Sequence, residues 1–211
     1  MGQKLVLALA LPIAAIAAYV CWPRKADLRA FDPAEMARLE TAMWRDYYEK
    51  RYPALFTHLY ESSRMQSGFS PLASVRISVS AALAAKTFQP TRSRAEAQAA
   101  MPYLVTYYEL VREGAPVAFD VQKAASRELD WWQARREHVA PQDYGVTVAD
   151  VAALTFGKPN DDPAMLAFGR GRADAMAYRD ARGQEITAQD WAAIEIQLRG
   201  AYQQLKAGIA Q

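Results

Sequence analysis

Helix-start signals recur along this chain of 211 residues and constrain its fold more than any other feature. An Asp, Ser or Thr before a helical pattern of apolar residues marks a helix start, because its side-chain oxygen binds a free backbone N–H. Such signals, or a proline that can open a helix, stand at Asp32, Ser70, Ser93, Asp120, Thr147, Pro163 and Thr187. The nearest approach to a strand is the short segment 117–119. We therefore predict an all-α bundle of roughly seven or eight helices over residues 32–211.

The helix that begins after Ser70 is expected to be the central one. Its apolar residues recur at three- and four-residue spacing, which places them on one helical face. They are Leu72, Val75, Val79, Ala82 and Leu83. Small Ala and Ser side chains elsewhere on this helix would let its neighbours approach closely. The spacing therefore predicts that this face points into the core.

Prolines and glycines refine the other helices. Pro102 lies inside the helix expected from Ser93 to about Gly114 and predicts a kink. Thr147 is expected to cap a short helix that ends at Gly157, after a loop containing Gly145. The segment Gly169-Arg170-Gly171 lies within a helical pattern with no strand before it. Its two glycines therefore favour close helix packing or a bend over phosphate binding.

The N-terminal segment is the second constraint, because Lys4 precedes an uninterrupted apolar run from Leu5 to Trp22. At 1.5 Å per residue, roughly 18 helical residues span about 27 Å, close to the thickness of the hydrocarbon core of a bilayer. Trp22 and the basic residues Arg24 and Lys25 suit the membrane interface. We predict a membrane anchor over residues 1–23, a linker over 24–31 and a helical domain over 32–211.

Two other interpretations of the N-terminal segment stay open. The pattern Ala15-Ile16-Ala17 resembles a signal-peptide cleavage site, and Pro12 could end its apolar region. The same residues could instead form a buried core helix. Cys21 would suit a lipoprotein, but Tyr19 and Val20 are larger than the residues that such processing requires. The expected location is a single-pass membrane protein with the helical domain outside the cytoplasm, contacting the membrane through residues 5–22.

Composition excludes several function classes. The 25 basic and 23 acidic residues nearly cancel and are interspersed, so we expect no nucleic-acid partner. Cys21 is the single cysteine, so a thiolate metal site or a cysteine nucleophile is absent from the helical domain. The chain has two histidines, His58 and His138, and neither follows a Glu by three residues as a di-iron carboxylate site requires. We predict no metal and no cofactor.

Polar residues on apolar helix faces are the candidate chemistry. Glu40 lies between Met36 and Met43 on one face, and Glu128 lies on the face that starts at Val121. A buried carboxylate needs a partner, and Arg45, Arg135 and Tyr107 are the candidates for that structural role. A second hypothesis gathers four residues into a polar site for acid–base work. Its members are Glu40, His58, Tyr107 and Glu128.

Aromatic residues beside arginines suggest an interaction surface, because this combination is frequent at protein interfaces and membrane surfaces. The candidates lie in two segments of the chain. They are Trp44, Tyr48, Trp131, Arg135 and Arg136. The alternative is ordinary core tryptophans edged by arginine side chains.

The segments 26–33, 39–48 and 128–132 resemble an uncharacterised bacterial family of membrane-anchored helical proteins. The resemblance implies an anchor followed by helices and no activity. We therefore expect a membrane-tethered interaction or ligand-binding protein of the cell envelope, with a protein or lipid partner. One version, a carrier of small apolar molecules, predicts an internal cavity of about 300 Å³ or more. The alternative is a metal-dependent or acid–base enzyme.

Overall fold

The computed structural model describes residues 15–22 and 24–210, and it confirms an all-α fold. Nine α-helices form a bundle, and no strand occurs among the described residues. The helices are α2 (Pro33–Tyr48), α3 (Tyr52–Glu61), α4 (Pro71–Phe88), α5 (Arg94–Ala97), α6 (Met101–Gly114), α7 (Val121–Arg136), α8 (Pro141–Phe156), α9 (Pro163–Arg182) and α10 (Ala188–Ile209). A π-helical turn, Ser62–Gln66, follows α3, and a 3₁₀ turn, Gln98–Ala100, precedes α6.

Side-chain caps begin most of these helices at the predicted residues. The Asp32 carboxylate accepts a hydrogen bond from the Glu35 amide at 2.8 Å, and Asp120 accepts one from the Lys123 amide at 3.0 Å. Ser70 and Ser93 cap α4 and α5 in the same way. Thr187 and Asp190 form a reciprocal capping box at the start of α10. Each cap satisfies a backbone donor that the helix itself cannot satisfy, which explains why the predicted starts are confirmed.

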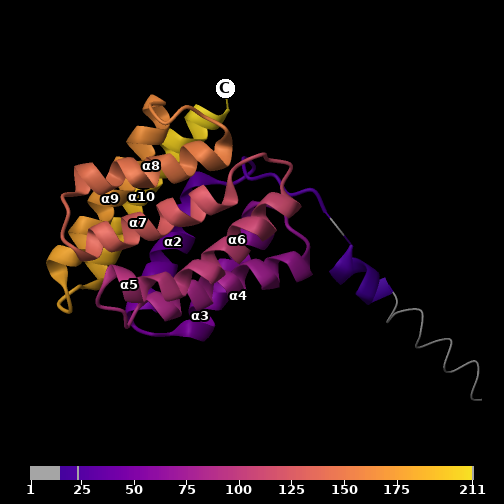
Figure 1. The fold of residues 1–211 in the computed structure, drawn as a ribbon, viewed down its shortest axis with the longest axis horizontal. Coiled ribbons are helices and arrows are strands. Elements are labelled where there is room, and N and C mark those ends of the chain that lie inside the picture. The colour runs from indigo at the N-terminus through magenta and orange to yellow at the C-terminus, as the bar shows by residue number, and fades with distance from the viewer. Residues whose placement is uncertain (1–14, 23, 211) are drawn as a thin grey trace, which may run out of the picture.

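The bundle consists of two groups of helices joined by α7 (Figure 1). In one group, α10 packs against α9 and α2, and α9 packs against α8. In the other group, α4 packs against α3 and α6. Helix α7 contacts α6 on one side and α8 on the other, while α2 contacts α3. The interior between the two groups is therefore bordered by helices from both ends of the chain.

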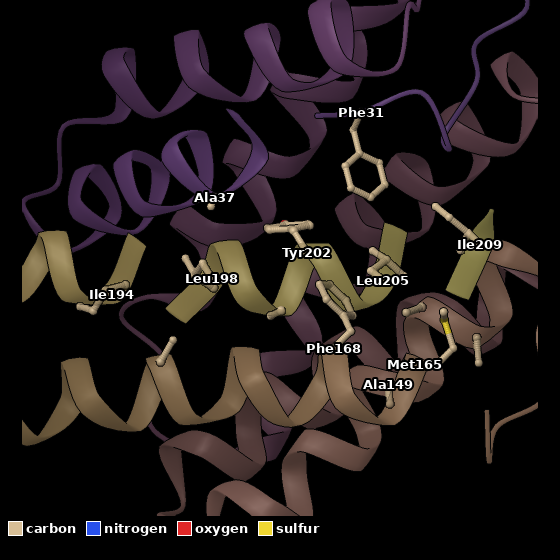
Figure 2. Close-up of a cluster of buried hydrophobic side chains, with 14 of the residues drawn as sticks. Phe31, Ala37, Ala149, Met165, Phe168, Ile194, Leu198, Tyr202, Leu205 and Ile209 are labelled. Carbon is tan, nitrogen blue, oxygen red and sulfur yellow. The ribbon is translucent and has the colours of Figure 1, made fainter. Parts of the chain in front are cut away.

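The largest apolar cluster centres on α10. Figure 2 shows Tyr202 lying between Phe31, which precedes α2, and Phe168 on α9. The ring centroids are 5.8 Å apart for Phe31 and Tyr202 and 5.3 Å apart for Phe168 and Tyr202. Such aromatic packing adds to the stabilisation from apolar burial. It holds Tyr202 with its hydroxyl directed away from solvent, since the residue is buried.

The predicted start of α8 and the predicted kink at Pro102 need correction. Helix α8 begins at Pro141 rather than at a Thr147 cap, so Gly145 lies inside it. A Cβ atom on Gly169 would lie 2.2 Å from the Gly145 carbonyl oxygen, so these glycines let α8 and α9 touch, as predicted for Gly169. Pro102 produces no kink within a helix, because the 3₁₀ turn before α6 leaves Pro102 in the first turn of α6, where no amide donor is needed.

The predicted orientation of α4, with its apolar face in the core, was wrong. Ser74, Ile77 and Ser78 point inward, whereas the apolar face predicted to be central is turned outward. The exposed fractions are 42% for Leu72, 38% for Val75, 41% for Val79 and 37% for Leu83. The inner face of α4 combines small serines with the apolar residues Ile77, Ala84 and Phe88, and the serines let α4 lie close to its neighbours.

The segment predicted as a linker is packed on the bundle. Ala26 and Phe31 are buried, and the Ala26 amide donates to the Gly114 carbonyl at 2.9 Å. Within the described part of the chain, no helix has the length and apolarity needed to cross a membrane. The predicted anchor falls largely on residues 1–14, which lie outside the described residues. Residues 15–21 are helical and largely exposed.

Candidate functional site

A cavity of about 420 Å³ lies between the two groups of helices. Most of the helices contribute to its wall. Apolar lining residues include Met43, Leu59, Ile77, Leu104, Val148 and Met176. Cavities of this volume lie within the range of small-molecule binding sites, and an apolar wall with few polar groups is their usual composition. The volume is also above the minimum of about 300 Å³ that a carrier of small apolar molecules would need.

Glu40 of α2 forms the first polar group in this wall. Its Oε1 accepts a hydrogen bond from Arg172 Nε of α9 at 2.9 Å, and Arg172 Nη2 binds the same oxygen. Its Oε2 accepts one from the Tyr202 hydroxyl at 2.6 Å. Glu40 is buried, so the ion pair and the hydroxyl together compensate the carboxylate for lost water.

Arg172 is held by charge and by aromatic rings. Burial by itself lowers the pKa of Arg172, but Glu40, Tyr202 and Glu128 outweigh that effect and raise it above its ordinary value. The guanidinium carbon lies 5.4 Å from the centroid of the Trp131 ring and 5.7 Å from that of Phe168. Arg172 therefore stays charged, and its position near two aromatic rings is stabilised by cation–π attraction.

Glu128 of α7 forms the second polar group. Its Oε2 accepts a hydrogen bond from the Tyr108 hydroxyl at 3.0 Å, and its Oε1 accepts one from Trp132 Nε1 at 3.0 Å. Both donors are neutral. Among the described residues, no Lys, Arg or His nitrogen lies within 4.0 Å of this carboxylate. Each oxygen retains a lone-pair site for a further donor.

The two tyrosines beside Glu128, Tyr107 and Tyr108, have raised pKa values. Desolvation, and then the charge of Glu128, raises the pKa of Tyr107 to about 12. The same two causes hold the pKa of Tyr108 well above its ordinary value. The two rings meet edge to face with centroids 4.9 Å apart. Both hydroxyls therefore remain protonated at neutral pH, and Tyr108 serves as a donor to the carboxylate.

His58 lies apart from this cavity. Its Nδ1 is 2.7 Å from Asp46 Oδ2, and the other oxygen of Asp46 accepts from Arg51 Nε at 3.0 Å. Asp46 is almost fully buried, with 1% of its surface exposed. Of the four residues proposed for acid–base work, Glu40, Tyr107 and Glu128 line one cavity and His58 does not.

The expected interaction surface is instead packed within the protein. Trp131 is only 6% exposed, and Trp44 and Tyr48 are half-buried. Arg135 forms a charged hydrogen bond from Nε to Asp180 Oδ2 at 2.8 Å and also binds the Tyr48 hydroxyl. Arg136 donates to the backbone carbonyls of Phe88, the last residue of α4, and Thr91 in the turn that follows. These five residues join helices and do not form an exposed patch.

The actual partners of the two carboxylates differ from those expected. Arg45 pairs with Glu49, and Arg135 pairs with Asp180. Arg172, Tyr202 and Tyr108 take those roles, and sequence reasoning assigned them no polar role. Arg172 lies beside the glycines of α9, but helical spacing alone does not reveal which distant helix it faces. No group of three or more His, Cys, Asp or Glu side chains in the described ranges is arranged to hold a metal.

Comparison of the chain with protein-family models, with curated proteins and with solved structures found no match.

Proposed function

We propose that this protein binds a small amphipathic molecule in the central cavity, with the apolar part along the helices and a cationic group at Glu128. The observation that carries the proposal is the apolar cavity of about 420 Å³ with a carboxylate whose hydrogen-bond donors are both neutral. Glu128 is partly buried, and a carboxylate with restricted access to water gains from a cation that enters with the ligand.

The charges along the cavity favour a cation over an anion. Glu40 and Arg172 neutralise each other, and Arg135 is paired with Asp180. Glu128 therefore leaves an excess of one negative charge on the wall. The aromatic rings of Tyr107, Tyr108 and Trp132 also line the cavity, and their faces attract ammonium groups. An anionic ligand would meet like charge at Glu128.

Binding is favoured over acid–base catalysis because the proposed acid–base group is not assembled. His58 pairs with Asp46, outside the cavity that holds Glu40 and Glu128. Arg172 and Tyr202 already occupy both oxygens of Glu40. We further propose that the apolar run 5–22 tethers this binding domain to a membrane of the cell envelope, which would concentrate it near amphipathic ligands.

The test compares three ligands that share one alkyl chain and differ in the head group. Octylammonium, octanol and octanoate are titrated into residues 24–211 by isothermal calorimetry, after circular dichroism has verified that the truncated domain is helical. This truncation retains Ala26 and Phe31, which are buried in the bundle. We expect octylammonium to bind most tightly and octanoate most weakly.

Each other outcome would contradict part of the proposal. Equal affinity for the three ligands would show that Glu128 does not recognise the charge of the head group. Binding of none of them at millimolar concentration would show that the cavity is not a site for alkyl ligands.

A further inference from the structure

Helix α4 presents an apolar stripe to the outside of the protein. Leu72, Val75, Val79 and Leu83 follow one another at intervals of three or four residues, so they share one face. Each is more than a third exposed, while the opposite face of α4 packs against α3 and α6. A continuous exposed stripe of large aliphatic side chains is unusual for a surface that meets only water.

The charges on α4 are all of one sign. Its charged residues are Arg76 and Lys86, and both are exposed. Neither forms a salt bridge with any described residue, and Lys86 Nζ lies 5.7 Å from the centroid of the Tyr52 ring. Basic residues beside an apolar helical face are typical of helices that lie in the interface of an anionic bilayer.

The first turn of α4 lies near the place where the N-terminal segment joins the bundle. The Asp27 amide donates to the Ser67 carbonyl at 2.8 Å, four residues before α4. Arg64 Nη2 donates to the Tyr19 hydroxyl at 3.1 Å. Figure 1 shows residues 15–21 extending outward beyond the bundle from that end. The described part of the apolar run, residues 15–22, therefore lies next to the start of α4.

We infer that the outward face of α4 lies on the surface of a bilayer containing anionic lipids. Leu72, Val75, Val79 and Leu83 would enter the boundary between head groups and acyl chains, and Arg76 and Lys86 would meet lipid phosphates. A second copy of the chain fits less well, because α4 has no acidic residue to oppose the two basic ones. This inference is independent of the ligand in the cavity.

The test places a fluorophore on α4 in the full-length chain. Val79→Cys is labelled with an environment-sensitive nitrobenzoxadiazole in a Cys21→Ser background, and the protein is reconstituted into phosphatidylglycerol–phosphatidylcholine vesicles. Ile196→Cys on α10 is the matched control, since Ile196 is also an exposed aliphatic residue, at 67%. We expect a blue shift and quenching by brominated lipids at position 79 and neither effect at position 196.

Replacing both Arg76 and Lys86 by Gln should lower the quenching at position 79 in anionic vesicles to the level found in pure phosphatidylcholine. Equal, weak quenching at positions 79 and 196 would overturn the inference. A blue shift at position 79 that disappears on dilution of the protein, without quenching by brominated lipid, would assign the face to a second copy instead. Neither result would alter alkyl-ligand binding in the cavity, so the two proposals fail separately.

Discussion

Arg172 of α9 donates from Nε to Oε1 of Glu40 on α2 at 2.9 Å, across 132 residues of sequence. This ion pair joins two helices and borders the central cavity. The pair is largely removed from bulk water, so replacing one member would leave the charge of the other without compensation.

Glu40→Leu should lower the free energy of unfolding by about 3–5 kcal/mol, because it leaves the Arg172 charge without its partner. The double variant Glu40→Leu with Arg172→Met should be more stable than Glu40→Leu alone. Urea denaturation of residues 24–211 followed by circular dichroism measures these two variants and Arg172→Met alone. Additive losses from the two substitutions would show that the pair is not coupled.

Glu128→Gln should lower the ratio of octylammonium affinity to octanol affinity about tenfold, which corresponds to about 1.4 kcal/mol of binding free energy. The amide retains the shape of the carboxyl group and one acceptor oxygen, so octanol affinity should change little. Glu109→Gln is the control, because Glu109 is exposed on the neighbouring helix α6. An unchanged octylammonium preference in Glu128→Gln would place the cation elsewhere.

Alkaline pH should unfold the protein, since several tyrosines are held protonated. The pKa values of Tyr47 and Tyr107 are each raised from 10.0 to about 12, by desolvation and by Tyr48 and Glu128 respectively. A raised folded-state pKa contributes stability that is full below pH 10 and is lost as the pH rises through 12. Tyrosinate absorbance and circular dichroism, recorded together, should change together over this range. Complete ionisation with helicity retained would contradict the assignment.

Gly169→Ala should destabilise the domain by about 1–3 kcal/mol, because the new methyl group would meet the backbone of α8 at Gly145 and Ala149. Gly200→Ala provides a matched control in α10, where a Cβ atom would meet nothing within 4 Å. That change should stabilise the domain by about 0.4–1 kcal/mol, through reduced freedom of the unfolded chain. Thermal unfolding of both variants measures the contrast, and equal shifts would refute close α8–α9 packing as the reason for Gly169.

Local sequence determined the helices themselves. Asp32, Ser70, Asp120 and Thr187 begin helices where their caps predicted, because a cap binds an amide only two or three residues away. The exceptions, at Pro102 and Thr147, arose where a neighbouring turn or helix changed the local outcome. Gly145 lies within α8, where the absence of a side chain lets α9 approach closely.

Tertiary structure decided which way each face points and which side chains meet. Periodicity correctly placed Leu72, Val75, Val79 and Leu83 on one face of α4, but it could not distinguish a core from an outer surface. The sequence also indicated that Glu40 and Glu128 need partners. Arg172 and Tyr108 were selected by the packing of α9 and α2 against α10 and of α6 against α7, because a carboxylate pairs with whichever donor the fold brings within about 3 Å.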